Sequence, residues 1–313
     1  MTGFPAAITC RRRPRQAILK IVTFSEGSGP ERLGALVGDQ VVDLEVAAAM
    51  HVPGGVHPFG DVLHFLEHGR AAIDRAAAVI PWAAVRSDGR FVRPLSEVQL
   101  LAPIPRPFKI LCLAGNYAEH WREGGQTAPP KANHTPEVFV KPITTIVGPG
   151  AAIRLPGPLC SKVDYEGELV AVIGTKAKYL SESEALSCVL GWTIGNDMSE
   201  RTWQRNDRTL WRAKNTDTFK PMGPWIETDF DLEAARTIVR VNGEVTDNFQ
   251  TNHMLYGVAT FISRMSQYCT LWPGDVVWMG TEGSPKNLKH GDVCEIEITG
   301  IGILRNPLVK EKR

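Results

Sequence analysis

The stretch VDYEGELVAVIG, residues 163–174, decides the fold of this chain. Its second half is an apolar run that ends at a glycine, a pattern typical of a buried β-strand. Successive side chains of a strand point to opposite faces, so Asp164, Glu166 and Glu168 share one face. The apolar side chains at 163, 165 and 169 are expected on the other face.

Several carboxylates in a row at the mouth of an apolar strand repel one another. They require solvent, arginines or a cation nearby. A hard divalent ion with oxygen ligands satisfies them economically, and Mg²⁺, or Mn²⁺ in its place, is such an ion. A solvated edge strand is the alternative that this stretch alone leaves open.

A second acidic feature lies in GWTIGNDMSERTWQ, residues 191–204. An apolar strand ends there at Asn196 and Asp197, before a polar segment that begins like a helix. Acidic side chains at strand ends are frequent in functional sites, because loops that carry function open there. The alternative is that Asp197 or Ser199 only caps the following helix.

The segment GNYAEHWREGG, residues 115–125, carries a histidine and an acid at helical spacing. If it is helical, His120 and Glu123 stand three residues apart on one face. Glu123 would then orient the imidazole of His120, which takes a proton from water near neutral pH. An ordinary surface pair is the alternative.

The composition excludes several classes of protein. Of 313 residues, 43% are hydrophobic and 22% charged, which is typical of a globular chain. Lys+Arg number 35 and Asp+Glu 34, so the net charge of +1 argues against a dedicated nucleic-acid binder. No apolar run has the length of a membrane span, so no membrane contact is expected. Six scattered cysteines without a CxxC pair indicate reduced thiols and a cytoplasmic location.

The chain divides into three expected parts. Residues 1–16, which include an arginine cluster, are expected to be a disordered tail. Residues 17–103 are expected to form a small αβ domain, with short strands over 17–46 and helix over 59–80. Prolines 103, 105 and 107 mark a linker. Residues 107–313 are strand-rich, with helical stretches at 181–189 and 254–268, and form the expected catalytic domain.

Eight motifs in order give the chain a resemblance to a known family. They are GNYAEH, FVKP, DYEGELVAVIG, GWTIGNDMSERTWQ, AKNTDTFKPMGPW, VNGE, LWPGDVVWMGT and GDVCEIEITGIGILRNP. Over about residues 107–310 the chain resembles the fumarylacetoacetate hydrolase family, specifically its acylpyruvase-like members. The resemblance implies an α+β, β-rich fold, a mixed β-sandwich roll with a small N-terminal αβ unit. It also implies a homodimer.

The resemblance also implies roles for individual residues. Position by position, the metal ligands fall on Glu166, Glu168 and Asp197, and the catalytic groups on His120, Glu123 and Lys214. Substrate-binding positions fall on Arg201, Gln204 and Thr281. Tyr117 and Lys141 match motif positions without an assigned role.

The implied activity is hydrolysis of a C–C bond in a small acylpyruvate-type 2,4-dioxo acid, with Mg²⁺ or Mn²⁺ chelating the 2-oxo acid as a Lewis acid. Breaking the C3–C4 bond leaves a pyruvate enolate, which the metal and Lys214 stabilise. Loss of CO₂ from an oxaloacetate-like acid, or a keto–enol isomerisation, passes through the same enolate. A decarboxylase or isomerase is therefore the alternative, and the presence of both His120 and Glu123 favours the hydrolase.

Two features bear on the substrate. Many members follow the GT turn with a loop of the form GTPxGVG, whereas this chain has GTEGSPKNL at 280–288, so the exact substrate stays open. Tryptophans at 121, 192, 203, 211 and 225 cluster in the motif region. They form either a wall for a bulky acyl group or ordinary core packing.

Overall fold

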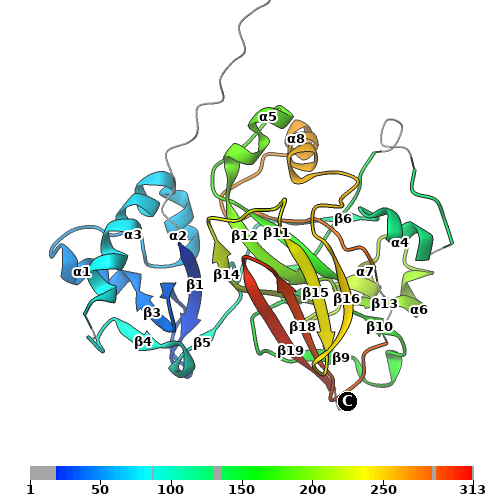
Figure 1. Ribbon diagram of the computed structural model, residues 1–313, viewed down its shortest axis with the longest axis horizontal. Helices are drawn as coiled ribbons and strands as arrows, with labels where there is room; N and C mark the ends of the chain where they lie inside the picture. Colours follow the sequence, from blue (N-terminus) through cyan, green and yellow to red (C-terminus); the bar gives the residue numbers. More distant parts are fainter. Residues whose placement is uncertain (1–18, 87, 124, 130–134, 284–286, 312–313) are drawn as a thin grey trace, which may run out of the picture.

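The computed structural model describes residues 19–86, 88–123, 125–129, 135–283 and 287–311. The tail expected at 1–16 and Cys10 lie outside the described residues. Two bodies are visible in Figure 1: an N-terminal unit in blue and cyan, and a larger β-rich body that carries the remaining elements.

One mixed sheet runs through both bodies. It has twelve strands. Its main path is β4 (Val92–Pro94), β3 (Gln40–Asp43), β2 (Arg32–Val37), β1 (Lys20–Ser25), β14 (Lys220–Glu227), β12 (Val189–Asn196), β11 (Gly167–Ile173), β17 (Val276–Trp278), β6 (Ile110–Ala114) and β7 (Glu137–Val140). Off this path, β5 (Gln99–Leu100) pairs with β1 and β8 (Ile146–Val147) pairs with β14.

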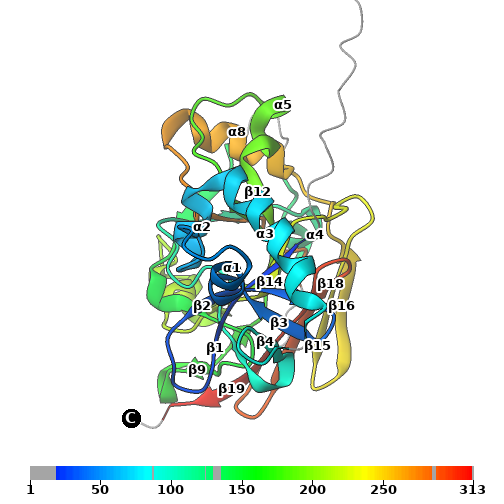
Figure 2. The ribbon, with the colours of Figure 1, turned by 90° about the vertical axis from the view of Figure 1, so that its left-hand side faces the viewer.

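The join between the two bodies is the antiparallel pair β1–β14, in which Ile21 lies opposite Ile226. Three helices, α1 (Leu44–His51), α2 (Val62–Glu67) and α3 (Gly69–Ala84), belong to the N-terminal unit. Figure 2 shows α1 and α3 lying over β1–β3. Whether residues 17–103 form a domain of their own stays a prediction.

A second sheet packs on the large one and closes the sandwich. Its order is β16 (Glu244–Gln250), β15 (Arg236–Val241), β18 (Val293–Ile298), β19 (Gly302–Lys310) and β9 (Ile153–Leu155). The helices of this body are α4 (Ala118–Glu123), α5 (Glu182–Ala185), α6 (Arg201–Gln204), α7 (Trp211–Asn215) and α8 (Val258–Tyr268). A short ladder, β10 (Val163–Asp164) with β13 (Ser199–Glu200), stands apart from both sheets.

Strand β11 is buried along its whole length, as its apolar run predicts. Leu169 and Ala171 belong to the core between the two sheets, and Val170 and Val172 to the core that extends under the N-terminal unit. The strand therefore separates two apolar cores. Its polar side chain, Glu168, lies at its beginning, where the other carboxylates also lie.

The local predictions are mostly close to the structure, with small corrections. The strand region expected to reach residue 46 ends at Asp43, because the Asp43 carboxylate accepts a hydrogen bond from Val46 N (3.1 Å) and caps α1. The helix expected over 59–80 is two helices, which Gly69 divides with its φ of 53°. Only residues 182–185 of the stretch 181–189 are α-helical.

No helix among the described residues combines the length and the apolar character that crossing a bilayer requires. The five described cysteines are all unpaired thiols.

Candidate metal centre and active site

The predicted metal ligands meet at one end of the β11–β12 pair. Gly167 lies opposite Asn196 in this antiparallel ladder, so the beginning of β11 adjoins the end of β12. Glu168 is on β11, and Glu166 and Asp197 flank the pair. All three are buried, and each offers a carboxylate oxygen within 4.8 Å of the others.

Backbone hydrogen bonds fix this corner. Asp197 N donates to the Glu166 carbonyl oxygen (2.9 Å), and Glu166 N donates to Asn196 Oδ1 (3.0 Å). Gly280 N donates to Glu168 Oε2 (3.0 Å) from the turn after β17. The carboxylates are therefore held at the ends of paired strands by backbone and side-chain hydrogen bonds, which favours a precise ligand geometry.

Four buried or half-buried cations face the carboxylates. Lys214 Nζ lies 2.5 Å from Glu166 Oε2 and 2.7 Å from Asp197 Oδ2. Two further ammonium groups reach Asp197 Oδ1: Lys141 at 2.5 Å and Lys220 at 2.9 Å. These cations neutralise much of the negative charge that burial would otherwise penalise.

Arg201 connects the triad to its surroundings. Its guanidinium lies 2.8 Å from Glu166 Oε1 and 2.9 Å from Asp164 Oδ2, and it donates to Gln204 Oε1 at 2.9 Å. Asp164 is thus an arginine partner beside the triad, on the same side as Glu166, as the alternation predicts.

The ligands differ in proton affinity. Burial raises the pKa of the Glu166 carboxyl, but Lys214 and Arg201 outweigh it and hold the pKa at about 2. Burial likewise opposes ionisation of Asp197, yet its three lysines bring its pKa well below the ordinary value. For Glu168 burial prevails and raises the pKa to about 7. Among the three candidate ligands, Glu168 is therefore the one whose ionisation is hardest.

The predicted histidine reaches the same cavity from α4. His120 lines a cavity of about 40 Å³ together with the triad, Lys214, Gln204 and Thr281. Burial lowers the pKa of His120, so its imidazole is neutral and able to accept a proton. Glu123 is the last residue of α4, but its side chain lies outside the described residues, so the expected pair with His120 stays a prediction.

Helix α4 is anchored just before it begins. Asn116 donates to the Met279 (2.8 Å) and Tyr256 (3.0 Å) carbonyl oxygens, and Tyr117 Oη donates to the Thr251 carbonyl oxygen (2.6 Å). This buried anchor places the histidine over the carboxylates.

Two lysines of this site were not predicted to belong to it. Lys141 matches a motif position without an assigned role, and Lys220 begins β14 in the run KPMGPWIE. Each was visible as a lysine beside an apolar strand run, a rare position for an unpaired charge. The sequence does not show that both reach the same aspartate.

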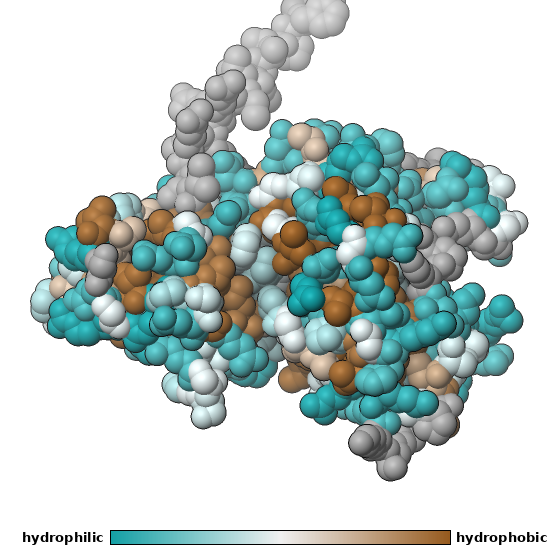
Figure 3. Space-filling model, turned by 60° about the horizontal axis from the view of Figure 1, so that its bottom comes forward, coloured by the Kyte–Doolittle hydropathy of each residue, from teal (hydrophilic) through white to brown (hydrophobic). Residues whose placement is uncertain are grey.

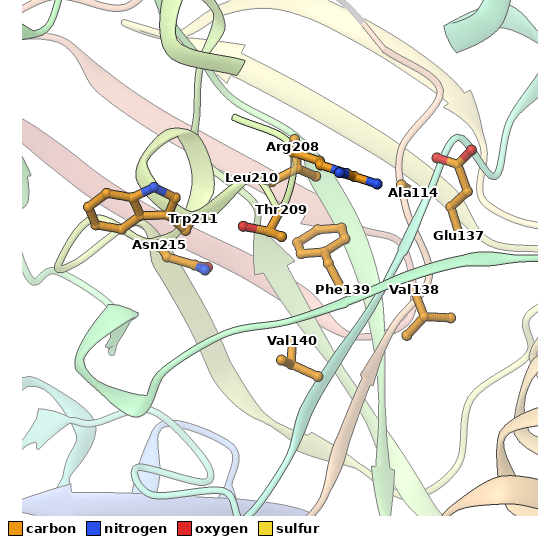
Figure 4. A pocket seen from close by; sticks show the side chains of 10 residues that line it. All are labelled: Ala114, Glu137, Val138, Phe139, Val140, Arg208, Thr209, Leu210, Trp211 and Asn215. Carbon is orange, nitrogen blue, oxygen red and sulfur yellow. The ribbon is translucent and has the colours of Figure 1, made fainter. Parts of the chain in front are cut away.

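A larger cavity of about 650 Å³ lies beside the first and shares Ala114, Phe139 and Leu210 with it. Figure 4 shows its lining, with the Phe139 side chain of β7 facing the segment that carries Thr209 and Leu210 and the Val140 side chain on the opposite side of the strand. Of the tryptophans considered for an acyl wall, Trp211 lines this cavity.

The donor set suits a hard divalent cation. Three carboxylates from a rigid strand pair supply oxygen only, which is the preference of Mg²⁺ and Mn²⁺. When bound, such an ion acts as a Lewis acid and a template for a 2-oxo acid.

Comparisons with known proteins show which family and fold the chain is similar to. The family model described as "Fumarylacetoacetate (FAA) hydrolase C-terminal" matches residues 109–309. Oxaloacetate tautomerase FAHD2A, mitochondrial, of Bos taurus is 37% identical over 264 residues, 79% of this chain and 79% of its own. The crystal structure of 2-hydroxyhepta-2,4-diene-1,7-dioate isomerase from Mycobacterium marinum is 31% identical, with a TM-score of 0.72 over 94% of this chain and 100% of its own.

A third similarity supports the fold alone. Maleylpyruvate hydrolase from Sphingobium sp. SYK-6, solved in complex with manganese (II) ion and pyruvate, is 24% identical, with a TM-score of 0.73 over 94% of this chain and 100% of its own. The predicted β-rich α+β fold is confirmed by these structures. By sequence and by fold, the chain belongs to the fumarylacetoacetate hydrolase family.

Proposed function

We propose that the chain is a Mg²⁺- or Mn²⁺-dependent hydrolase that cleaves the C3–C4 bond of an acylpyruvate-type 2,4-dioxo acid. The observation that carries this proposal is the meeting of the buried triad, Lys214 and the neutral His120 at one cavity of about 40 Å³. The donor set, which consists of carboxylate oxygens, supports the choice of ion.

The chain's own residues supply the remaining chemistry. We assign binding of the 2-oxo acid carboxylate to Thr281, Gln204 and Arg201. Thr281 and Gln204 line the cavity, and Arg201 donates a hydrogen bond to Gln204. His120 takes a proton from water at an imidazole nitrogen, and the water oxygen attacks the C4 carbonyl. The C3–C4 electron pair moves towards the 2-oxygen, where the Lys214 ammonium stabilises the enolate charge. The proton that His120 took from water is returned at C3, which gives pyruvate, and the acyl group, which now carries the water oxygen, leaves as a carboxylic acid.

A second candidate is a tautomerase, isomerase or decarboxylase at the same site. The relatives named oxaloacetate tautomerase and 2-hydroxyhepta-2,4-diene-1,7-dioate isomerase, both above 30% identity, favour it. These reactions also form an enolate beside Lys214, but they require no attacking water.

Product analysis separates the candidates. Pyruvate release from acetyl-, fumaryl- and benzoylpyruvate is measured with Mg²⁺, Mn²⁺ and EDTA, and oxaloacetate is followed for CO₂ and for its enol–keto conversion. We expect metal-dependent pyruvate release. Enol–keto conversion or CO₂ without any pyruvate release would replace the hydrolase by the second candidate.

His120 gives the sharper test. H120Q removes the base for water, so hydrolysis should fall about 10²–10⁴-fold while metal affinity is kept. H68Q, a histidine exposed on the N-terminal unit, is the matched control. Unchanged hydrolysis in H120Q would remove this residue from the mechanism.

The proposal includes a cytoplasmic homodimer. The unpaired cysteines suit a reducing compartment. Figure 3 shows apolar side chains gathered on one face, over the N-terminal unit and over the adjoining body. Apolar patches of this kind mark protein–protein interfaces. Light scattering after size exclusion measures the mass, and a monomer at micromolar concentration would contradict the dimer.

A further inference from the structure

We propose that the 650 Å³ cavity beside β7 holds the distal half of the substrate, and that Arg208 binds a second carboxylate there. The preferred substrate is then a 2-oxo dioic acid with an apolar middle. This inference rests on the proposed site for a 2-oxo acid at the carboxylate triad, and it names the substrate class of that site.

The two cavities differ widely in volume. The cavity at the triad measures about 40 Å³ and is lined mainly by charged and polar groups. This volume leaves no space for an acyl group beside the 2-oxo acid end of a substrate, so the acyl group has to continue elsewhere. The larger cavity shares Ala114, Phe139 and Leu210 with it, so a chain that leaves the triad along these residues enters the larger space.

The segment that carries Arg208 is held in place. The buried Asp207 carboxylate accepts hydrogen bonds from Arg212 N (3.0 Å) and Ala213 N (2.9 Å) and from Arg212 Nε (2.8 Å). Leu210 adopts a φ of 58°, a conformation that is costly for leucine and persists only where the surroundings impose it. This turn directs Leu210 to the boundary between the two cavities.

The side chains that line the larger cavity change from apolar near the triad to charged farther from it. Next to the triad, Phe139 and Leu210 are apolar, and both line the two cavities. Figure 4 shows the Arg208 side chain extending past Leu210, with its guanidinium above the Phe139 ring. Among the described residues Arg208 forms no ion pair, and it is the cation of this cavity. An apolar path that ends at a guanidinium matches an unsaturated chain that ends in a carboxylate.

Glu137 carries the charge opposite to that of Arg208 and so tests whether charge governs binding in this cavity. It lines the same cavity, on the far side of Phe139 from Trp211 in Figure 4. A second substrate carboxylate is attracted by Arg208 and repelled by Glu137. Neutralising the two residues should therefore change the affinity for a dioic acid in opposite directions, which simple disturbance of the cavity would not do.

Binding of unreactive acids tests the site without turnover. With Mn²⁺ present, calorimetry compares 2-oxoadipate, which has a distal carboxylate, with 2-oxohexanoate, which has the same chain length without it. We expect the unmodified protein to bind 2-oxoadipate at least tenfold more tightly. R208Q should lose this preference, and E137Q should increase it.

The matched control is R205Q, because Arg205 is an exposed arginine of the same loop that does not line the cavity. R205Q should bind both acids as the unmodified protein does. Equal affinity for the two acids in the unmodified protein, or an unchanged preference in R208Q, would overturn the inference.

Turnover distinguishes this inference from the proposed function. Among acylpyruvates, kcat/KM for fumarylpyruvate should fall at least tenfold in R208Q, and that for acetylpyruvate should stay within twofold. One outcome would refute the subsite alone: the unmodified protein and R208Q release pyruvate from acetylpyruvate equally, and the unmodified protein shows no preference for 2-oxoadipate over 2-oxohexanoate. Retained preference for 2-oxoadipate without any pyruvate release would refute the hydrolase alone.

Discussion

The ammonium of Lys220 lies 3.7 Å from the centre of the Trp278 ring, and both side chains are fully buried. The same ammonium reaches Asp197 Oδ1 at 2.9 Å. A cation loses hydration when it is buried, and contact with an aromatic face replaces part of that lost stabilisation. The indole thus supports a lysine that holds a candidate metal ligand.

Gly195 makes room for this arrangement, so G195A should destabilise the protein. A Cβ at this position would come within 1.9 Å of the Trp278 ring. Overpacking of this kind costs about 1–3 kcal/mol of unfolding free energy. Urea denaturation measures it, with G60A as the control, because a Cβ at Gly60 meets its nearest neighbour only at 3.8 Å. Equal stability of the two variants would contradict the packing argument.

Replacing Lys220 by methionine should strengthen metal binding. K220M removes one positive charge close to Asp197 and keeps an apolar side chain of similar length against Trp278. A cation a few ångströms from a divalent ion opposes binding even at an effective dielectric constant of about 20. We expect Mn²⁺ affinity to rise about tenfold, which is about 1.4 kcal/mol.

Titration with Mn²⁺ followed by electron paramagnetic resonance measures this affinity. K289M, which removes an exposed lysine, is the control and should bind as the unmodified protein does. Weaker binding in K220M would mean that the lysine acts mainly by holding Asp197 in position.

Asp197 should be indispensable for both binding and stability. D197N removes a candidate metal ligand and leaves the ammonium groups of Lys141, Lys214 and Lys220 without their shared counter-charge. Breaking one partner of a buried ion pair costs about 3–5 kcal/mol. We expect loss of measurable Mn²⁺ binding and a lower Tm.

The matched control is D217N, which neutralises an exposed aspartate just after α7 and should change neither property. D197N with full Mn²⁺ affinity would remove Asp197 from the ligand set.

Metal affinity should depend on pH through Glu168. Burial raises the pKa of this carboxyl to about 7, so below pH 7 a proton competes with the metal for the carboxylate. The affinity for Mn²⁺ should therefore rise about tenfold per pH unit up to about pH 7 and level off above it. Calorimetry between pH 5.5 and 8.5 measures the profile. A profile that is flat between pH 5.5 and 7 would contradict this assignment.

Local sequence patterns predicted the parts of the site that depend on one strand. The alternation in 163–174 places Asp164, Glu166 and Glu168 together, and each does lie in this corner. The cap of α1 was not predicted, because the strand pattern was extended to residue 46, although Asp43 precedes the helical run LEVAAAM. The roles of the site residues came from the family resemblance and stay predictions.

Contacts across strands could not be read in this way. Lys220 reaches Asp197 because β14 pairs with β12, a relationship that depends on the whole sheet. The turn at Leu210 has no glycine or asparagine to signal its φ of 58°. The larger cavity, which β7 and this turn form together, was invisible for the same reason.

The pairing of β1 with β14 has a consequence for protein engineering. A chain shortened to residues 107–313 would lose β1 and leave the edge of β14 that pairs with it open. On its other side β14 pairs with β12, the strand that leads to Asp197. An uncovered edge of this kind recruits other chains and promotes aggregation. The N-terminal unit therefore cannot be exchanged freely. A replacement unit from another family member would need a first strand that pairs with β14 at Ile226, as β1 does.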